Sequence, residues 1–460
     1  MVQNGEDDRN EADEDVLDAR RIGAIIEAAA AGDVAFLTEL LEPLHAADIA
    51  DLLEQVSRSE RRDILRLWSG EIDGDILSEI DEGIREEVIE SLSPDVLAEA
   101  VRELDTDDVV DILEDLEEPQ KALILGALDS ADRVAVERAM SYPDYSAGRL
   151  MQREVVVAPM HWTVGQAIDF MRGATHLPDQ FYHVILVDPR MKPQAYVTLG
   201  RLLSSRREVR LSDIREESFR TVEATEPESD VAYLFNQYHL ISCPVVDEDG
   251  RLVGVITIDD AMNVLDEEHE EDMLRLAGVD DEASLSDGVW DTLRGRLPWL
   301  LINLVTASLA AFVISLFEET ISTIVVLAAL MPIVASMGGN AGTQSLTVSV
   351  RALATRDLTS ANAARFVRRE AAVGAINGLV FAVILGAIAT FAFGWPLLAV
   401  VIGLAMVINL LVAALAGVLV PLTLNRLKLD PALASGTFVT TMTDVVGFFA
   451  FLGLATLVLL

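Results

Sequence analysis

The sequence is poor in cysteine and in lysine. It has a single cysteine, Cys243, which excludes a framework of internal disulfide bonds. Only Lys121, Lys192 and Lys428 are lysines among 34 basic residues, whereas acidic residues number 75. The resulting net charge of −41 excludes a nucleic-acid-binding protein, because such proteins need a basic surface.

The negative charge is confined to the first part of the chain. From Trp290 onward there are seven acids and nine bases, a net charge of +2, so residues 1–289 carry −43. Hydrophobic residues nevertheless make up 51% of the whole. This contrast predicts an acidic soluble part followed by an apolar membrane part. The first 15 residues are acidic and polar, unlike a signal peptide, so we expect a disordered tail and a soluble part in the cytoplasm.

Long apolar stretches occur only in the second part. Each can cross a hydrocarbon core of about 30 Å as a helix. They cover residues 297–317, 321–350, 371–393, 396–424 and 432–460. Pro332, Gly338 and Gly339 are expected to bend or break the second of them. Arginine and lysine occur before the first stretch and in alternate loops, which predicts a multi-pass protein of the cell membrane with the N-terminus inside and the C-terminus outside.

The fifth stretch contains a carboxylate, Asp444, within the segment Thr440-Thr441-Met-Thr-Asp444. An acid at that depth costs about 2.5–3.5 kcal/mol on insertion scales, so we expect Asp444 to face a polar cavity or a cation. Thr440, Asp444 and Gly447 share one helix face. The alternative is a hydrogen bond from Asp444 to a neighbouring helix.

The second stretch contains the segment Gly338-Gly339-Asn340-Ala341-Gly342-Thr343-Gln344. Glycines, amides and a hydroxyl in an apolar run favour an irregular backbone that lines water, although a close helix crossing through small residues is also possible. For Asn340, Asn377 or Asn409 alone, hydrogen bonding between helices is the simpler interpretation. Carboxylate, amide and carbonyl oxygens suit a hard cation such as Mg²⁺ or Ca²⁺.

The soluble part has two internally repeated regions. Residues 44–54 match residues 104–114 at a shift of 60, which predicts stacked short helices over 16–147. Residues 148–265 instead show two strand–helix units related by a shift of 59, with Asp188 matching Asp247 and Thr198 matching Thr257.

The second region resembles a tandem pair of CBS domains, a small regulatory module. In that family a Gly-x-x-Thr-x-x-Asp motif often binds an adenosine ribose, and Gly254, Thr257 and Asp260 fit this motif. The first repeat departs from it, with Ala195 and Arg201 in place of the glycine and the aspartate. Adenine-nucleotide binding, with ATP as the expected ligand, is therefore predicted for the second repeat only, and a purely structural pair is the alternative.

Eight acids occur within residues 259–272, without lysine or arginine. Like charges at this spacing destabilise an isolated helix, and the cytoplasmic leaflet is usually negative as well. A compensating cation is expected, unless this is simply a solvated face.

Together these features resemble the MgtE-type magnesium channel family. The most specific segments are 338–344, Arg351-Ala-Leu-Ala-Thr-Arg-Asp357, Asp430-Pro-Ala-Leu433 and Thr441-Met-Thr-Asp444. The resemblance implies a homodimer whose cation pore lies on the twofold axis. It assigns Asp444 and Asp430 to pore metal binding, and the polar segments around them to the pore lining. The lining residues are Gly338, Gly339, Asn340, Gln344, Thr440 and Thr441.

The resemblance also implies feedback regulation by Mg²⁺. In such a scheme, cytosolic Mg²⁺ bridges the helical domain, the CBS pair and an acidic plug helix, which then closes the pore. The acids matched to regulatory ions are Asp107, Asp111, Asp260, Glu268, Glu271 and Asp272, whereas Asn263 and His239 stand where acids are expected.

The predicted organisation is multidomain: an all-α superhelical N-terminal domain, an α/β tandem CBS pair and an α-helical membrane domain with five spans. The expected boundaries are 1–15 for the tail, 16–147 for the helical domain, 148–210 and 211–265 for the CBS repeats, 266–296 for the acidic plug helix and 297–460 for the pore domain. The predicted function is a magnesium-selective influx channel. A Na⁺- or H⁺-coupled carrier and a non-transporting nucleotide sensor are the alternatives. An enzyme is not expected, because no catalytic motif occurs.

Overall fold

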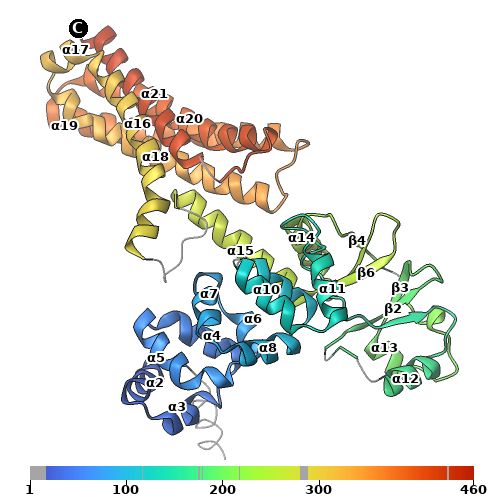
Figure 1. The fold of residues 1–460 in the computed structure, drawn as a ribbon. Helices are drawn as coiled ribbons and strands as arrows, with labels where there is room; N and C mark the ends of the chain where they lie inside the picture. Colours follow the sequence, from blue (N-terminus) through green and yellow to red (C-terminus); the bar gives the residue numbers. More distant parts are fainter. Residues whose placement is uncertain are drawn as a thin grey trace, which may run out of the picture. The chain divides into compact units, whose positions relative to one another are not determined.

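The computed structural model describes residues 17–460 except 115, 117, 175, 176, 179, 217, 280–287, 433 and 434. The expected tail, 1–15, and part of the expected plug segment lie outside the described residues. The chain divides into two compact units, Met1–Glu267 and Glu268–Leu460 (Figure 1). Each is described by itself below.

The first unit begins with short helices, blue to cyan in Figure 1. They are α2 (Ala19–Ala31), α3 (Val34–Leu41), α4 (Ala46–Gln55), α5 (Arg58–Trp68), α6 (Gly74–Glu79), α7 (Glu82–Ser91), α8 (Pro94–Glu103), α9 (Thr106–Glu114), α10 (Glu118–Ala127) and α11 (Ser130–Ala139), with a 3₁₀ turn, η1, at Ser69–Glu71. Many begin at a capping side chain; Ser93, for example, accepts the N–H of Val96 with Pro94 at the first helical position. Their apolar faces form one continuous core. The predicted stack of short helices is confirmed.

Two small sheets of the same topology follow. The first contains β1 (Val157–Pro159), β2 (His183–Val187) and β3 (Pro193–Thr198), and the second contains β4 (Val222–Glu223), β5 (Ser242–Val246) and β6 (Leu252–Thr257). In each sheet the first strand is parallel to the second and the second is antiparallel to the third. The register repeats as well. His183 pairs with Thr198 in the first sheet and Ser242 pairs with Thr257 in the second, so the second pair follows the first at a shift of 59 residues. The accompanying helices are α12 (Val164–Gly173), α13 (Leu199–Ser204) and α14 (Glu228–Tyr238), with a 3₁₀ turn, η2, at Leu211–Asp213.

The acidic segment is helical, but its bounds differ from the expectation of one helix over 266–296. Helix α15 spans Ile258–Ala277 and follows β6 without a loop. Its start is set by packing, because Ala261 and Val264 are buried before the densest acids are reached. A separate helix, α16, begins at Val289 and continues into the apolar region.

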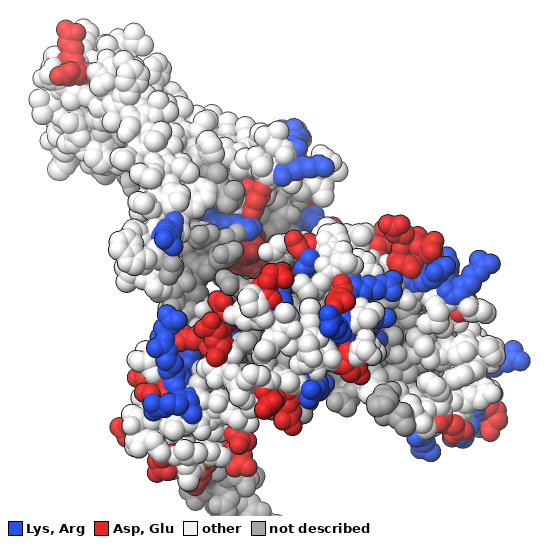
Figure 2. Space-filling view, viewed as in Figure 1, with Lys and Arg blue, Asp and Glu red and all other residues white. Residues whose placement is uncertain are grey.

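The second unit contains five helices long and apolar enough to cross a membrane, as the hydropathy pattern predicts. They are α16 (Val289–Ser315), α18 (Val326–Ala354), α19 (Ala363–Phe393), α20 (Pro396–Arg426) and α21 (Ser435–Leu459), with a short helix, α17 (Glu318–Thr323), after the first. Figure 2 shows white surface over most of this unit and dense charge over the first unit. Helix α20 is the most buried of the five, whereas α16 and α19 expose most of their apolar surface.

The expected break in the second span is wrong. Helix α18 runs without interruption through Pro332 and through residues 338–344, so the glycines do not produce an irregular backbone. The chain breaks earlier, between α17 and α18. The glycines instead allow a close crossing of helices, which is the alternative interpretation. A side chain at Gly417 of α20 would meet the carbonyl oxygen of Gly342 at 2.6 Å, and one at Gly342 would meet Val439 of α21 at 2.6 Å.

Asn409 of α20 lies at the centre of these crossings. It is completely buried, and its Nδ2 donates a hydrogen bond to the carbonyl oxygen of Val334 on α18, at 2.7 Å. Added side-chain carbons at Gly338 of α18 and Gly447 of α21 would meet the Asn409 amide nitrogen at 2.3 and 2.9 Å. One amide therefore joins three helices, which confirms the interhelical role expected for Asn409.

These close approaches give a stability prediction. We expect Gly417→Ala to destabilise the membrane unit by about 1–3 kcal/mol, the usual range for overpacking, because the clash is with backbone that cannot rotate away. Gly339→Ala is the matched control on α18, since an added carbon there meets nothing within 4 Å. Thermal unfolding of the detergent-solubilised protein measures both. Equal melting temperatures for the two variants would contradict this packing.

Candidate functional site

Two neighbouring helices of the membrane unit carry polar faces. On α18, an exposed face at helical spacing contains Ser336, Asn340, Thr343, Gln344 and Thr347. On α21, the corresponding face contains Thr437, Thr440, Thr441 and Asp444, exposed or partly exposed. The two helices pack together where Gly342 approaches Val439 and Thr443. Three of the four amide or hydroxyl residues predicted to line a pore, Asn340, Gln344 and Thr440, are therefore exposed on adjacent helix faces. The fourth, Thr441, and the acid Asp444 are partly exposed on the same face of α21.

The threonines of these faces satisfy their hydroxyl donors within the helices. Thr343 Oγ1 donates to the Gly339 carbonyl at 3.0 Å, and Thr440 Oγ1 donates to the Gly436 carbonyl at 2.9 Å. Their lone pairs stay available to a cation or to its water shell. The Asp444 carboxylate receives no hydrogen bond or ion pair from any residue that the structure describes. The alternative prediction, a structural hydrogen bond to a neighbouring helix, is therefore not supported.

Asp430, the second predicted pore acid, lies in the connection between α20 and α21. Its Oδ1 accepts the N–H of Ala432 at 2.7 Å, which closes a tight turn at Pro431. Its Oδ2 accepts a hydrogen bond from Nη1 of Arg275, the base in the last turn of α15, also at 2.7 Å. The same guanidinium nitrogen lies 2.9 Å from Glu271. Asp430 is thus part of an ion-pair cluster with α15.

The acids of α15 in this cluster repel one another. Partial burial and the nearby Asp272 carboxylate raise the pKa of Glu268. Burial and the Asp430 carboxylate raise the pKa of Asp272. Arg275 opposes both shifts. The three predicted regulatory acids Glu268, Glu271 and Asp272 therefore share one negative region with Asp430.

The first unit contains a second acidic group, where α9 meets the start of α15. Asp260 hydrogen-bonds to Asp107, and its Oδ2 accepts a hydrogen bond from Thr257 Oγ1 at 2.5 Å. Burial and the Asp260 carboxylate raise the pKa of Asp107 well above its usual value. The same two causes raise the pKa of the neighbouring Asp108 to about 7, and burial raises that of Asp260 to about 6.

Hydrogen bonds from uncharged donors to carboxylates hold α9 in this position. Thr106 Oγ1 donates to Glu154 at 2.8 Å, and Gln152 Nε2 donates to Asp105 at 3.3 Å. Asp111, also predicted to bind a regulatory ion, instead forms an ion pair with the buried Arg85 at 2.9 Å. The structure thus brings together Asp107 and Asp260 of the predicted set but gives Asp111 a different partner.

The donor chemistry of these groups fits Mg²⁺. A hard cation lowers the electrostatic repulsion between closely placed carboxylates. Mg²⁺ is commonly held by one or two carboxylates while it keeps several waters. Within the described ranges, no three His, Cys, Asp or Glu side chains are placed to hold an ion directly. The arrangement therefore fits a hydrated ion better than a fully protein-bound one.

Residues of the predicted nucleotide motif contact other parts of the chain. A side chain at Gly254 would meet the Gln152 carbonyl oxygen at 2.6 Å, and Asp260 is engaged by Thr257 and Asp107. The cavity between the two repeats, lined in part by His183, Ser242 and Thr257, holds only about 20 Å³. That is room for about one water molecule.

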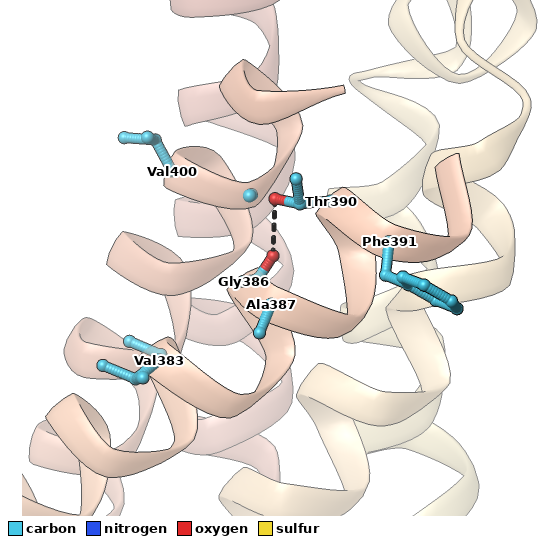
Figure 3. Close-up of a pocket in the computed structure, with 8 residues that line it drawn as sticks. Val383, Gly386, Ala387, Thr390, Phe391 and Val400 are labelled. Atoms are coloured by element: carbon cyan, nitrogen blue, oxygen red, sulfur yellow. Dashed lines mark hydrogen bonds between the residues drawn. The ribbon is translucent and has the colours of Figure 1, made fainter. Parts of the chain in front are cut away.

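A groove on the surface of the second unit is unrelated to these acids. It is an open groove of about 740 Å³ between α19 and α20. Figure 3 shows Val383, Val400 and Phe391 around it, with Thr390 bonded to the Gly386 carbonyl. Because its lining is small and apolar, it offers no ligand for a cation.

Sequence reasoning missed three contributors to these groups. Arg275 is the only arginine or lysine in α15, a signal visible in the sequence. Gln152 and Glu154 hold α9 from a segment 47 or 48 residues away, which no local pattern indicates.

Three family models match the chain. Residues 331–454 match a divalent cation transporter family, MgtE, 44–145 match the MgtE intracellular N domain, and 211–267 match the CBS domain. The magnesium transporter MgtE of Thermus thermophilus is 34% identical over 72% of this chain and 74% of its own length. This chain belongs to the MgtE family. The magnesium transporter MgtE of Bacillus subtilis is 29% identical over 72% of this chain and 74% of the relative.

Two solved structures each cover about half of this family member. A crystal structure of the cytosolic domain of the Mg²⁺ channel MgtE in complex with ATP is 29% identical, covers 53% of this chain and 99% of the solved chain, and has a TM-score of 0.48. The soluble part of a magnesium transporter is 24% identical over 54% of this chain and 98% of the solved chain, with a TM-score of 0.47.

The raised pKa values give a pH prediction for the metal-free protein. A carboxyl whose pKa is raised on folding contributes most stability below its unfolded value, and that stability is lost as pH rises through the folded value. For Asp108 the loss falls between about pH 4 and pH 7. We expect Asp108→Asn to raise the melting temperature at pH 8 in EDTA and to narrow the difference between pH 5 and pH 8. Thermal unfolding at the two pH values measures this, with the exposed Asp51→Asn as control; identical pH profiles for Asp108→Asn and wild type would contradict it.

Proposed function

We propose that this chain transports Mg²⁺ across the cell membrane through a pore that contains Asp444. The observation that carries the proposal is the carboxylate of Asp444, which is half-buried on the polar face of α21 and has no hydrogen-bond or ion-pair partner among the residues that the structure describes. An ionised acid inside a span requires water or a cation beside it. The named relatives, magnesium transporters of three bacteria, support Mg²⁺ as the cargo.

A second copy of the chain would complete the pore. The polar faces of α18 and α21 are exposed or partly exposed in the single chain, where lipid contact would leave polar atoms of the Asn340 and Gln344 amides unsatisfied. Facing a second copy instead, the two sets would enclose a polar passage with paired Asp444 carboxylates. Mg²⁺ gives up water reluctantly, so the threonine and amide oxygens would contact its water shell. Asp430 is proposed as the second acid, at the cytoplasmic end.

We propose that cytosolic Mg²⁺ regulates this pathway through the two acidic groups. Asp107 and Asp260 form one, and Glu268, Glu271 and Asp272 form the other together with Asp430. Ions that bind the docked arrangement more tightly than the separated one shift the population toward closure. A change from 1:99 to 99:1 requires about 5.5 kcal/mol, which several weak sites can supply jointly.

The topology follows from the bases of the membrane unit. The exposed bases lie at the ends of α18, α19 and α20 that flank two connections, or within those connections: Arg351, Arg365, Arg368, Arg426 and Lys428. The two connections are separated by two spans, so they share one side of the membrane. The positive-inside rule places that side in the cytoplasm, with the C-terminus outside. Adenine-nucleotide binding by the second CBS repeat, with ATP as the expected ligand, stays a prediction from the motif of Gly254, Thr257 and Asp260.

Two other functions make different predictions for flux. A Na⁺- or H⁺-coupled carrier would require the gradient of the coupling ion, whereas a channel would not. A non-transporting sensor would show no flux at all. The unpartnered Asp444 favours a transport function over a sensor, since a membrane anchor has no use for an intramembrane acid.

The pore assignment predicts the effect of Asp444 substitutions. We expect Asp444→Asn to lower Mg²⁺ flux into proteoliposomes at least tenfold, because the fixed negative charge that attracts the ion is lost. Asp357→Asn, which neutralises an exposed loop acid, should retain flux. Folding is checked for both variants by size-exclusion chromatography and melting temperature. Normal flux through folded Asp444→Asn would remove this residue from the pathway.

The regulatory assignment predicts a change in feedback. Neutralising Glu268, Glu271 and Asp272 together as Gln, Gln and Asn should raise the cytosolic Mg²⁺ needed for half-inhibition several-fold. The control variant neutralises Asp266, Glu267 and Glu270 of the same helix and therefore has the same net charge. Flux against Mg²⁺ on the cytoplasmic face measures both. An equal shift in the two variants would mean that overall charge, and not a particular acid group, controls inhibition.

A further inference from the structure

We infer that Arg275 positions the C-terminal end of α15 on the membrane unit without a metal ion, and so sets the Mg²⁺ concentration at which transport is inhibited. This inference rests on the proposed function for its effect on flux. The contact itself does not depend on that function. It is observed between residues that all lie within the second unit.

The first support is the ion pair. Nη1 of Arg275 lies 2.7 Å from Oδ2 of Asp430 and 2.9 Å from Oε2 of Glu271. The side chains of Arg275 and Asp430 are only 21% and 28% exposed, so solvent screens this pair less than a surface pair. Asp430 is held in turn by the N–H of Ala432, so the carboxylate has a fixed position beside the first turn of α21.

The second support is an apolar contact next to the ion pair. Leu276, the neighbour of Arg275, packs against a buried cluster of the membrane unit that includes Leu346, Ala432 and Val439. The Leu276 carbonyl oxygen lies 3.5 Å from the position that a side chain at Gly436 would take. The end of α15 is thus fixed by one charged and one apolar contact, at the same connection between α20 and α21.

The third support is the charge around the guanidinium. Glu268, Asp272 and Arg275 are spaced at i, i+4 and i+7, on one face of α15, and Arg275 on that face reaches Asp430. A negative helix end beside a negative turn would be repelled, and Arg275 supplies the one arginine or lysine charge of α15. Its guanidinium therefore does part of what a bridging cation would do: it joins acids of α15 to Asp430.

This gives Arg275 a definite role in regulation. With Arg275 in place, part of the docking free energy of α15 is present before any ion binds, so less Mg²⁺ is needed to complete closure. Without it, ions must compensate the full repulsion among Glu268, Asp272 and Asp430. Removing Arg275 should therefore raise the inhibiting Mg²⁺ concentration, not merely lower flux.

The flux experiment uses the full-length chain in proteoliposomes with Mg²⁺ varied on the cytoplasmic face. We expect Arg275→Gln to raise the half-inhibiting concentration about three- to tenfold. Arg426→Gln, which removes an exposed base at the same end of the membrane unit, should leave it unchanged. The exchange variant Arg275→Glu with Asp430→Arg should return it toward the wild-type value. Each curve is scaled to its own maximal flux, so an effect of Asp430 on conduction does not enter.

A second measurement tests the contact without transport. Spin labels replace the exposed Met273 and Phe438 in a Cys243→Ala background, and excess unlabelled chain is co-expressed to suppress distances between copies. In EDTA we expect one narrow distance distribution, broadened by Arg275→Gln and restored by the exchange variant. Unchanged distances and an unchanged half-inhibiting concentration in Arg275→Gln would overturn the inference. If wild type is not inhibited by Mg²⁺, the proposed regulation fails, and the distances in EDTA still decide whether Arg275 positions α15.

Discussion

The membrane unit depends on the close approach of α18, α20 and α21 around the buried amide of Asn409. The amide donates to a backbone oxygen of α18, and glycines on α18 and α21 leave the space that it fills. Gly447 lies one helical turn beyond Asp444, so the packing that seats α21 against Asn409 also fixes the direction of the Asp444 face. A single polar group inside the apolar core thus helps to determine where the proposed pore acid, Asp444, points.

The buried acids differ from Asn409, because burying a charge destabilises the fold unless a nearby group compensates it. In the first unit, Asp107 and Asp260 are close enough to share a hydrogen bond, and their burial penalises ionisation. In the second unit, Arg275 supplies part of the missing positive charge. The two groups differ in this respect: Thr257, the side chain that donates to Asp260 in the first group, is uncharged, whereas the second group contains the arginine. Mg²⁺ would therefore have the larger effect on the first group.

Much of the fold could be predicted from local patterns. Hydropathy located five spans, the 60-residue repeat predicted stacked helices, and the 59-residue repeat predicted two sheets whose registers match. The error at α18 arose because glycine and proline were weighed by their helix propensity, whereas packing against α20 and α21 holds the helix together there. The acids of the candidate site were visible as charges, but their partners were not. Arg275 meets Asp430 across 155 residues, and no periodicity encodes such a pair.

The length of α20 has a consequence for the lipid around the protein. This helix has 31 residues and is therefore about 46 Å long, and it is free of charged residues from Pro396 to Leu424. A hydrocarbon core of about 30 Å is shorter than that apolar length, so α20 must tilt or the bilayer must thicken around it. Tilting α20 would carry α18 and α21 with it, because all three are joined at Asn409. Bilayer thickness, set by acyl-chain length, is therefore a physical variable that acts on the tilt of the helices that bear the polar faces.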